Sequence, residues 1–252
     1  MKVLILAAGK GTRLKPFTNK KPKILLNFGN SNILEYLLSC LKENNINEIY
    51  VVTGYKSAQI KKKFKKEVNL ILNKKYRTTN SIYSLFLAKK KLNNSKFFLI
   101  NGDILISKKY FKLNNKNKKN SFTFGIKKKK VNLGEMNLVI KKNIVQDISK
   151  NISSKISNTE SAQISYFSKK DSRLLFNSVD KLINSNQKNL FPASAYGDII
   201  KKSCLKIKYV SKNHWFELDN ITDYKKIKKA LNNKLKILKL KNLLEKIRKK
   251  NI

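Results

Sequence analysis

Residues 2–18 read KVLILAAGKGTRLKPFT, a short aliphatic run followed closely by two glycines. The run from Lys2 to Leu6 predicts a buried parallel strand, and the small residues after it predict a loop at the carboxyl end of that strand. Glycine permits the backbone angles of an anion-binding turn, and small side chains let the backbone approach a phosphate chain closely. Because ligands of open parallel sheets bind beyond the carboxyl ends of the strands, this loop is the first candidate for a ligand site.

The spacing of the glycines excludes two common nucleotide-binding motifs. Leu14 stands where the dinucleotide-binding pattern GxGxxG has its third glycine. No Gly-Lys-Ser/Thr sequence follows four residues after a glycine, as a P-loop requires. A GxG turn alone is typical of many tight connections after a strand, so the evidence for a phosphate site has to come from a longer pattern.

Strand-like and helix-like segments alternate through roughly the first hundred residues. The expected strands after the first are residues 48–53, 68–72 and 97–100, and the expected helices are residues 32–43, 58–66 and 81–92. This alternation is typical of a parallel sheet with helices on both faces. We therefore predict an α/β fold of three layers (αβα) with a mostly parallel, Rossmann-like central sheet.

The second half of the chain has shorter strand-like segments, expected to extend the sheet and to build a lobe over one end of it. They are residues 122–126, 138–140, 144–148, 162–167 and 206–210, with a helix expected over 174–183 and a long basic helix over 222–249. We find no internal repeat and no linker. We predict one domain over residues 1–230 and a basic helical tail over residues 231–252, which packs on its own domain, pairs with a second subunit in a homodimer, or lies on an anionic membrane.

The net charge is extreme: 57 Lys and Arg against 15 Asp and Glu give +42. Such a charge favours a polyanionic partner, either nucleic acid or a membrane surface. The lysines are nevertheless spread along the whole chain, and arginine, the preferred reader of phosphates and bases, is scarce. We therefore attribute the charge to a biased composition rich in Lys, Asn and Ile, and we expect that no nucleic acid is required. A basic nucleic-acid-binding protein remains the alternative from another functional class.

Several other classes are excluded by simple counts. No apolar run approaches the roughly 20 residues of a membrane-spanning helix, so no stable membrane insertion is expected. The first apolar run is too short for a signal peptide, which predicts a cytoplasmic protein. Cys40, Cys204 and His214 are the only cysteines and histidine, and they lack the spacing of a zinc site.

A longer pattern around the first loop is far more specific than its glycines. Leu6-Ala7-Ala8-Gly9-x-Gly11-Thr12-Arg13-Leu14-x-Pro16-x-Thr18, followed by Pro22-Lys23, resembles the signature of the sugar-phosphate nucleotidylyltransferase (NTP transferase) family. The resemblance covers roughly residues 1–230 and implies a GT-A-like nucleotidyltransferase domain. It implies that Arg13 and Lys23 are catalytic cations beside the phosphates, and that the nucleotide also contacts Leu6, Ala7, Ala8, Gly9, Gly11 and Thr12.

Acidic residues stand at two further positions where a metal could bind. Asp103 follows the apolar run FFLI in the sequence Asn-Gly-Asp, although a single aspartate at the end of a strand is more often a turn former. Glu217 and Asp219 would share one face of a strand, because side chains alternate along it, while Asp223 or Thr222 would cap the tail helix. The resemblance implies that Asp103 and Asp219 hold Mg²⁺, with Glu217 as a weaker candidate.

Within the family, one segment is similar to the bacterial phosphocholine cytidylyltransferases. It reads Asn73-Lys74-Lys75-Tyr76, then Asn80-Ser81-Ile82-Tyr83-Ser84-Leu85. The similarity implies that Asn80 and Ser81 contact the base, that the nucleotide is CTP and that CMP passes to a small phosphorylated acceptor with release of pyrophosphate. Asn137 departs from the pattern, because a lysine is expected near that position. A sugar-1-phosphate enzyme using CTP, UTP, dTTP or GTP is the alternative from the same family.

The expected acceptor is phosphocholine first, with related small phosphates or phosphonates behind it. A quaternary ammonium group is held best by aromatic faces with a carboxylate nearby. Tyr196 and Trp215, with Glu217 to balance the charge, are therefore the candidate acceptor-binding residues, although ordinary core packing is the more common role of a single aromatic side chain.

Overall fold

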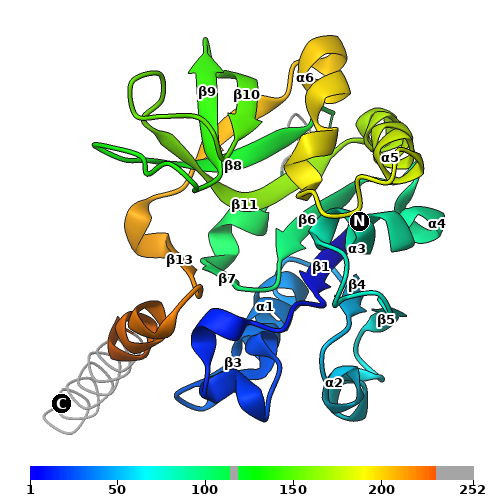
Figure 1. The fold of residues 1–252 in the computed structure, drawn as a ribbon, viewed down its shortest axis with the longest axis vertical. Helices are drawn as coiled ribbons and strands as arrows, with labels where there is room; N and C mark the ends of the chain where they lie inside the picture. Colours follow the sequence, from blue (N-terminus) through cyan, green and yellow to red (C-terminus); the bar gives the residue numbers. More distant parts are fainter. Residues whose placement is uncertain (114–118, 231–252) are drawn as a thin grey trace, which may run out of the picture.

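The computed structural model describes residues 1–113 and 119–230, with one large sheet through the middle of the molecule (Figure 1). The sheet has nine strands in the order β5-β4-β1-β6-β11-β8-β12-β10-β9. In chain order they are β1 (Lys2–Ala7), β4 (Glu48–Thr53), β5 (Asn69–Leu72), β6 (Phe97–Asn101), β8 (Phe122–Lys127), β9 (Asn137–Lys141), β10 (Ile144–Ser149), β11 (Thr159–Phe167) and β12 (Lys206–Tyr209).

Helices connect or flank these strands. They are α1 (Ile33–Lys42), α2 (Ser57–Phe64), α3 (Ser81–Leu87), α4 (Lys89–Leu92), α5 (Lys169–Asn184) and α6 (Gly197–Ser203). The helix expected over residues 81–92 is divided into α3 and α4 at Ala88. The helix α6 was not predicted, since its short and mixed sequence carries little apolar periodicity. A two-stranded hairpin of β2 (Asn27–Phe28) and β3 (Ser31–Asn32) precedes α1.

The N-terminal half of the sheet is parallel, as the alternation of strand and helix predicts. Strand β1 pairs in parallel with β4 and β6, and β4 pairs in parallel with β5. Parallel neighbours need a crossover connection, which is usually a helix. The carboxyl ends of these strands therefore meet at one edge of the sheet, where the loop after β1 lies.

Strand β1 shows why helices cover both faces of the sheet. Val3 and Ile5 pack in the apolar core on the side of α1 and α2, whereas Leu4 and Leu6 pack in a second core with α3 and α5. Successive side chains of a strand point to opposite faces, so a run of consecutive buried residues needs a cover on each side. The expected three-layer α/β architecture is confirmed.

The second half of the sheet differs from the expected, mostly parallel arrangement. Strand β11 pairs antiparallel with β6, β8 and β9, and β10 pairs antiparallel with β9 and β12, whereas β8 and β12 are parallel. Strands β8 to β11 follow one another without the intervening helices that usually connect parallel neighbours, and of these consecutive strands β9 and β10 pair directly. These strands form the lobe above the parallel half in Figure 1.

Two short strands bring distant segments together, and the sequence analysis predicted a strand near Glu217 but none after Asp103. Strand β7 (Ile104–Ile106) pairs antiparallel with β13 (Trp215–Glu217). Just beyond this pair, the Leu218 amide donates a hydrogen bond of 2.9 Å to the Asp103 carbonyl. Three residues are too few to show a strand period, and the pairing itself depends on the rest of the fold.

The last described segment is a helix over residues 221–230. The Asn220 side chain accepts a hydrogen bond of 3.1 Å from the Asp223 amide, and the Asp223 carboxylate accepts one of 3.2 Å from the Asn220 amide. This reciprocal pair is a capping box, so the cap is Asn220 rather than Thr222 or Asp223 as predicted. The rest of the expected tail lies outside the described residues. In residues 1–113 and 119–230, no helix is both long and apolar enough to cross a membrane.

Candidate active site

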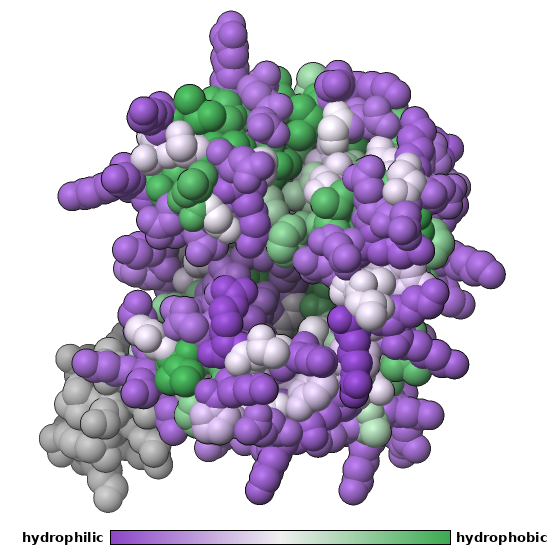
Figure 2. Space-filling model, viewed as in Figure 1, coloured by the Kyte–Doolittle hydropathy of each residue, from purple (hydrophilic) through white to green (hydrophobic). Residues whose placement is uncertain are grey.

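A pocket of about 490 Å³ opens at the carboxyl ends of the parallel strands, and Figure 2 shows a hollow near the centre of this face. The loop after β1, the start of α3, the end of β6 and the residues at the end of β13 contribute to its wall. The wall includes every residue predicted to contact the nucleotide or a metal, together with one of the acceptor candidates. These are Leu6, Ala7, Ala8, Gly9, Gly11, Thr12, Arg13, Lys23, Asn80, Ser81, Asp103, Asp219 and Glu217.

Two glycines allow the close approaches on which this wall depends. Gly11 has a φ of 63°, in the left-handed region that glycine adopts at little cost, and its carbonyl accepts a hydrogen bond of 2.9 Å from the Thr18 hydroxyl. Gly102 lies so near the end of β1 that an added Cβ would stand 2.7 Å from the Leu6 carbonyl oxygen. The second contact places Asp103 directly beside the loop.

Two cations and two carboxylates form one cluster at the loop. The Lys23 Nζ lies 2.8 Å from Asp103 Oδ2 and 3.8 Å from Asp219 Oδ1, and Arg13 forms an ion pair with Asp219. The Lys23 side chain is 16% exposed, whereas the Arg13 side chain is 72% exposed. The cluster therefore combines a largely buried cation with one that is mostly exposed at the edge of the pocket.

The same cluster suits a divalent cation. Asp103 Oδ1 is buried and has no hydrogen-bond partner among the described residues. Those residues also contain no group of three or more His, Cys, Asp or Glu side chains arranged as a metal cage. Mg²⁺ commonly binds through one or two carboxylates while water and phosphate oxygens complete its octahedron. Asp103 and Asp219 fit that kind of site.

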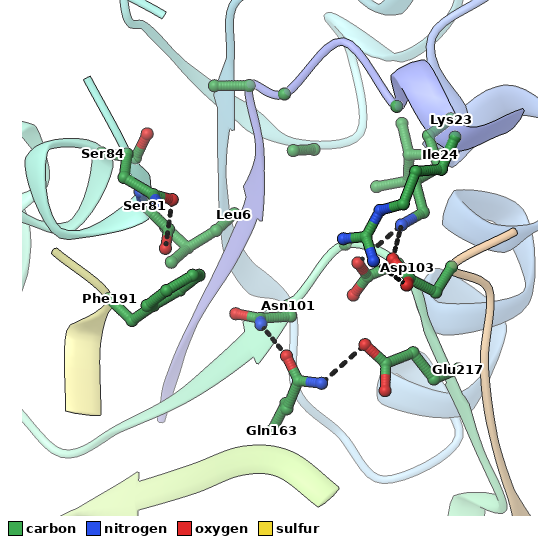
Figure 3. A pocket seen from close by; sticks show the side chains of 18 of the residues that line it. Leu6, Lys23, Ile24, Ser81, Ser84, Asn101, Asp103, Gln163, Phe191 and Glu217 are labelled. Carbon is green, nitrogen blue, oxygen red and sulfur yellow. Dashed lines mark hydrogen bonds and ion pairs between the residues drawn. The ribbon is translucent and has the colours of Figure 1, made fainter. Parts of the chain in front are cut away.

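Glu217 lines the pocket, and hydrogen bonds link it to two amide side chains that the sequence analysis did not predict to lie there (Figure 3). The Gln163 Nε2 donates a hydrogen bond of 2.6 Å to Glu217 Oε1, and the Asn101 Nδ2 donates to Gln163 Oε1. Burial raises the pKa of Glu217 to about 8, and the negative charge of Asp103 adds to this effect. Glu217 and Asp219 both line the pocket and Leu218 between them is buried in the core, as predicted, although β13 ends at Glu217 and Asp219 lies beyond it.

The opposite wall is formed by residues 73–84, within the segment that resembles the cytidylyltransferases. Asn80 caps α3, because its Oδ1 accepts a hydrogen bond of 2.7 Å from the Ser81 amide. Behind it, the buried Asn73 side chain donates a hydrogen bond of 3.1 Å to the Ser84 hydroxyl, which holds the segment against the start of the helix. Asn80 and Ser81 line the pocket at this wall.

Tyr196 and Trp215, predicted to bind the acceptor, do not line the main pocket. Tyr196 is 4% exposed and donates a hydrogen bond of 3.2 Å to the Ser165 hydroxyl. It lines a cavity of about 40 Å³ that adjoins the main pocket, since Asn101, Met136, Gln163 and Phe191 line both. The Trp215 ring packs against the core, and its Nε1 donates a hydrogen bond of 3.0 Å to the Ala162 carbonyl. Both aromatic rings thus lie behind the wall, in the packing role that the sequence analysis named as the more common one.

Several pocket residues were given no role by the sequence analysis. They are Asn101, Met136, Lys150, Gln163 and Phe191, all of which line the main pocket. Asn101 precedes Asp103 in the sequence Asn-Gly-Asp, the other four belong to no motif, and each of the five comes from a different strand or loop. Gln163 gives no signal in β11, whose sequence TESAQISYF is largely polar, and its orientation depends on an irregularity in that strand.

Comparisons with known proteins agree with this geometry. The family model described as nucleotidyl transferase matches residues 2–234. The chain is 32% identical over 238 residues to choline-phosphate cytidylyltransferase of Streptococcus pneumoniae, which covers 92% of this chain and 99% of that protein. A solved structure of CTP:phosphocholine cytidylyltransferase from the same species is similar with a TM-score of 0.80 and 30% identity, covering 91% of this chain and 98% of the other.

A third similarity covers a shorter stretch. Over 91 residues the chain is 40% identical to CTP:phosphoglutamine cytidylyltransferase of Campylobacter jejuni, which is 35% of this chain and 36% of that protein. The two relatives are named for the same nucleotide and for different acceptors.

Proposed function

This chain belongs to the nucleotidyl transferase family, and we propose that it transfers CMP from CTP to a small phosphorylated acceptor with release of pyrophosphate. The observation that carries the proposal is a cluster of two cations and two carboxylates beside the loop after β1, which contains Gly9 and Gly11. The cluster consists of Arg13, Lys23, Asp103 and Asp219. A triphosphate cleaved between its α and β phosphorus atoms needs donors and cations in that arrangement. The names of both cytidylyltransferase relatives support CTP as the nucleotide.

In the proposed reaction, a phosphate oxygen of the acceptor attacks the α-phosphorus of CTP in line. The new P–O bond forms as the bond between the α-phosphorus and the bridging oxygen breaks, and that oxygen leaves with pyrophosphate. No covalent intermediate with the protein is required, so the work of the site is to position the two phosphates and to stabilise their charge. With the triphosphate bound, Lys23 and Arg13 exchange part of their contact with the carboxylates for phosphate oxygens.

We propose Mg²⁺ as the cofactor, held by Asp103 and Asp219. When bound, it neutralises phosphate charge and orients the reacting groups. The orphaned oxygen of Asp103 and the pairing of both carboxylates with cations support this assignment.

CTP selection is assigned to the wall at the start of α3. Asn80 Oδ1 accepts hydrogen bonds from the Ser81 amide at 2.7 Å and from the Ser81 hydroxyl at 3.3 Å. The hydroxyl can rotate away, and the amino group of cytosine, which uracil lacks, can then donate to the same oxygen. A site built on such a bond rejects the wrong base strongly, because its polar groups are then left unpaired.

The spread of lysine along the whole chain does not favour the alternative of a nucleic-acid-binding protein. Hydrophilic side chains project from all parts of the face in Figure 2 and do not gather into one stripe. We propose a cytoplasmic location, where CTP is available as a substrate. A homodimer and a boundary between a domain and a tail near residue 230 remain predictions.

The test is pyrophosphate release measured with Mg²⁺ across CTP, UTP, GTP and ATP, each with phosphocholine, other small phosphates and hexose-1-phosphates. We expect activity with CTP and a small phosphorylated acceptor, lost in Lys23→Ala and retained in the exposed control Lys21→Ala. Turnover confined to hexose-1-phosphates, or equal rates with UTP, would instead identify a sugar-1-phosphate enzyme.

A further inference from the structure

The backbone of Gln163 has an unusual conformation for a residue inside a strand. Its φ is 56°, and the pairing of β11 with β8 shifts register between Ser161 and Ser165. The left-handed region suits glycine best, because a Cβ crowds the backbone there. At a bulge, such a conformation re-aims a side chain. Here it directs the Gln163 amide into the pocket, as Figure 3 shows.

The hydrogen bonds of Gln163 determine which part of its amide faces a ligand. Its oxygen accepts from Asn101 and its nitrogen donates to Glu217, so the orientation of the amide is set. An amide nitrogen carries two hydrogens, and the contacts in the described part of the chain use one of them. Gln163 can therefore offer a second N–H to a bound molecule.

Lys150 provides a cation in the same pocket. Its Nζ lies 4.6 Å from the centre of the Phe191 ring, and both residues line the pocket. Lys150 forms no ion pair with any acidic side chain within residues 1–113 and 119–230. Its charge is available to an anionic group of a ligand.

The pocket is poorly suited to a quaternary ammonium group. Such a group binds over several aromatic faces, and the aromatic residues of the pocket wall are Tyr76 and Phe191. The Phe191 ring is already covered by the Lys150 ammonium, which would repel a second cation. Tyr196 and Trp215 are held in the core by their own hydrogen bonds.

We propose, building on the proposed CMP transfer, that the acceptor carries a carboxylate in addition to its phosphate. Lys150 and Gln163 receive that carboxylate as donors and are the specificity-determining residues of the acceptor site. A carboxyl oxygen of Glu217, which lines the same pocket, can accept a hydrogen bond from an ammonium N–H of the same acceptor, so a phosphorylated amino acid is the chemical class that fits all three side chains.

A matched pair of acceptors tests the proposal, because O-phosphoserine is phosphoethanolamine with one added carboxylate. With CTP and Mg²⁺, we expect kcat/KM at least tenfold higher for O-phosphoserine than for phosphoethanolamine or phosphocholine. Lys150→Met should remove that advantage by lowering kcat/KM for O-phosphoserine to about that for phosphoethanolamine, and Gln163→Gly should lower the ratio of these two values. The control Lys170→Met removes one positive charge from an exposed position outside the pocket and should change nothing.

The outcomes separate this inference from the proposed function. If CMP transfer occurs but phosphocholine or phosphoethanolamine is preferred, or if Lys150→Met affects the pair equally, the carboxylate site is wrong and the cytidylyltransferase proposal stands. If no acceptor reacts with CTP, the proposed function fails. Calorimetry of the same acceptors, titrated into protein with Mg²⁺ and a non-hydrolysable CTP analogue, then decides the inference. Tighter O-phosphoserine binding that Lys150→Met abolishes supports it, and equal binding of the pair overturns it.

Discussion

Lys23 donates a hydrogen bond of 2.8 Å to Asp103, joining the loop after β1 to the end of β6. The two residues come from segments that are separate in sequence and adjacent in the sheet, because β1 and β6 are parallel neighbours. Lys23 also lies 3.8 Å from Asp219, so a single ammonium group lies between two carboxylates. This arrangement holds the carboxylates close together despite their repulsion and places a cation where a phosphate chain is expected.

Asp103→Asn and Asp219→Asn should each lower kcat at least 100-fold at saturating Mg²⁺ while the protein stays folded. Each amide keeps the shape of the side chain but loses the charge with which a metal is held. Steady-state kinetics and circular dichroism check this, with the exposed Glu67→Gln as the control. Turnover near that of the wild type in either variant contradicts the assignment of the metal site.

Lys23→Ala and Arg13→Ala should depress kcat more than they weaken CTP binding. Donors that face charge developing in a transition state are typically worth about 3 kcal/mol, or roughly two orders of magnitude in rate. Single-turnover kinetics and CTP titration separate the two effects. In a chain with so many lysines, the loss of one from the surface should be silent, so Lys21→Ala is the matched control, and an unchanged rate for Lys23→Ala counts against the site.

Gly102→Ala should destabilise the fold, because its methyl group would stand 2.7 Å from the Leu6 carbonyl oxygen and 3.0 Å from the Ala7 Cβ. Overpacking of this kind costs about 1–3 kcal/mol. Gly197→Ala, at the start of α6, meets nothing within 4 Å and should be neutral or slightly stabilising. Urea denaturation of both variants measures the difference, and equal stabilities would show that the turn after β6 has room to move.

Tyr224 should stabilise the packing of the last described helix against residues 17–28, which follow the loop after β1. Its ring lies 4.9 Å from that of Phe17 and 5.1 Å from that of Phe28, and its hydroxyl donates a hydrogen bond of 2.9 Å to the Asn27 carbonyl. Tyr224→Ala should cost about 1–2 kcal/mol of stability through the lost ring contacts.

The conservative variant Tyr224→Phe keeps the rings together and removes one hydrogen bond, so it should cost about 1 kcal/mol or less. Urea denaturation of the two variants compares these costs. Equal losses would show that the hydrogen bond of the hydroxyl, and not the ring packing, stabilises the contact between the last described helix and residues 17–28.

The local sequence was sufficient for the first half of the fold and for the phosphate end of the site. Leu6, Gly11 and Lys23 are positioned by the chain next to them. Leu6 lies near the end of β1, Gly11 forms the turn that follows, and Lys23 lies in the next short segment, which returns to the same loop. The alternation of strand and helix then determines a parallel sheet, and a parallel sheet brings Asp103 to the edge where β1 ends.

The acceptor end of the site could not be predicted in this way. The positions of Gln163 and Glu217 depend on a register shift in β11 and on the pairing of two three-residue strands, neither of which leaves a local pattern. Contacts with residues distant in sequence also hold Tyr196 and Trp215 in the core, although both side chains have the chemistry to bind a cation. Short-range order follows from local propensities, whereas the direction of a side chain at a bulge or a strand end is decided by the packing of segments distant in sequence.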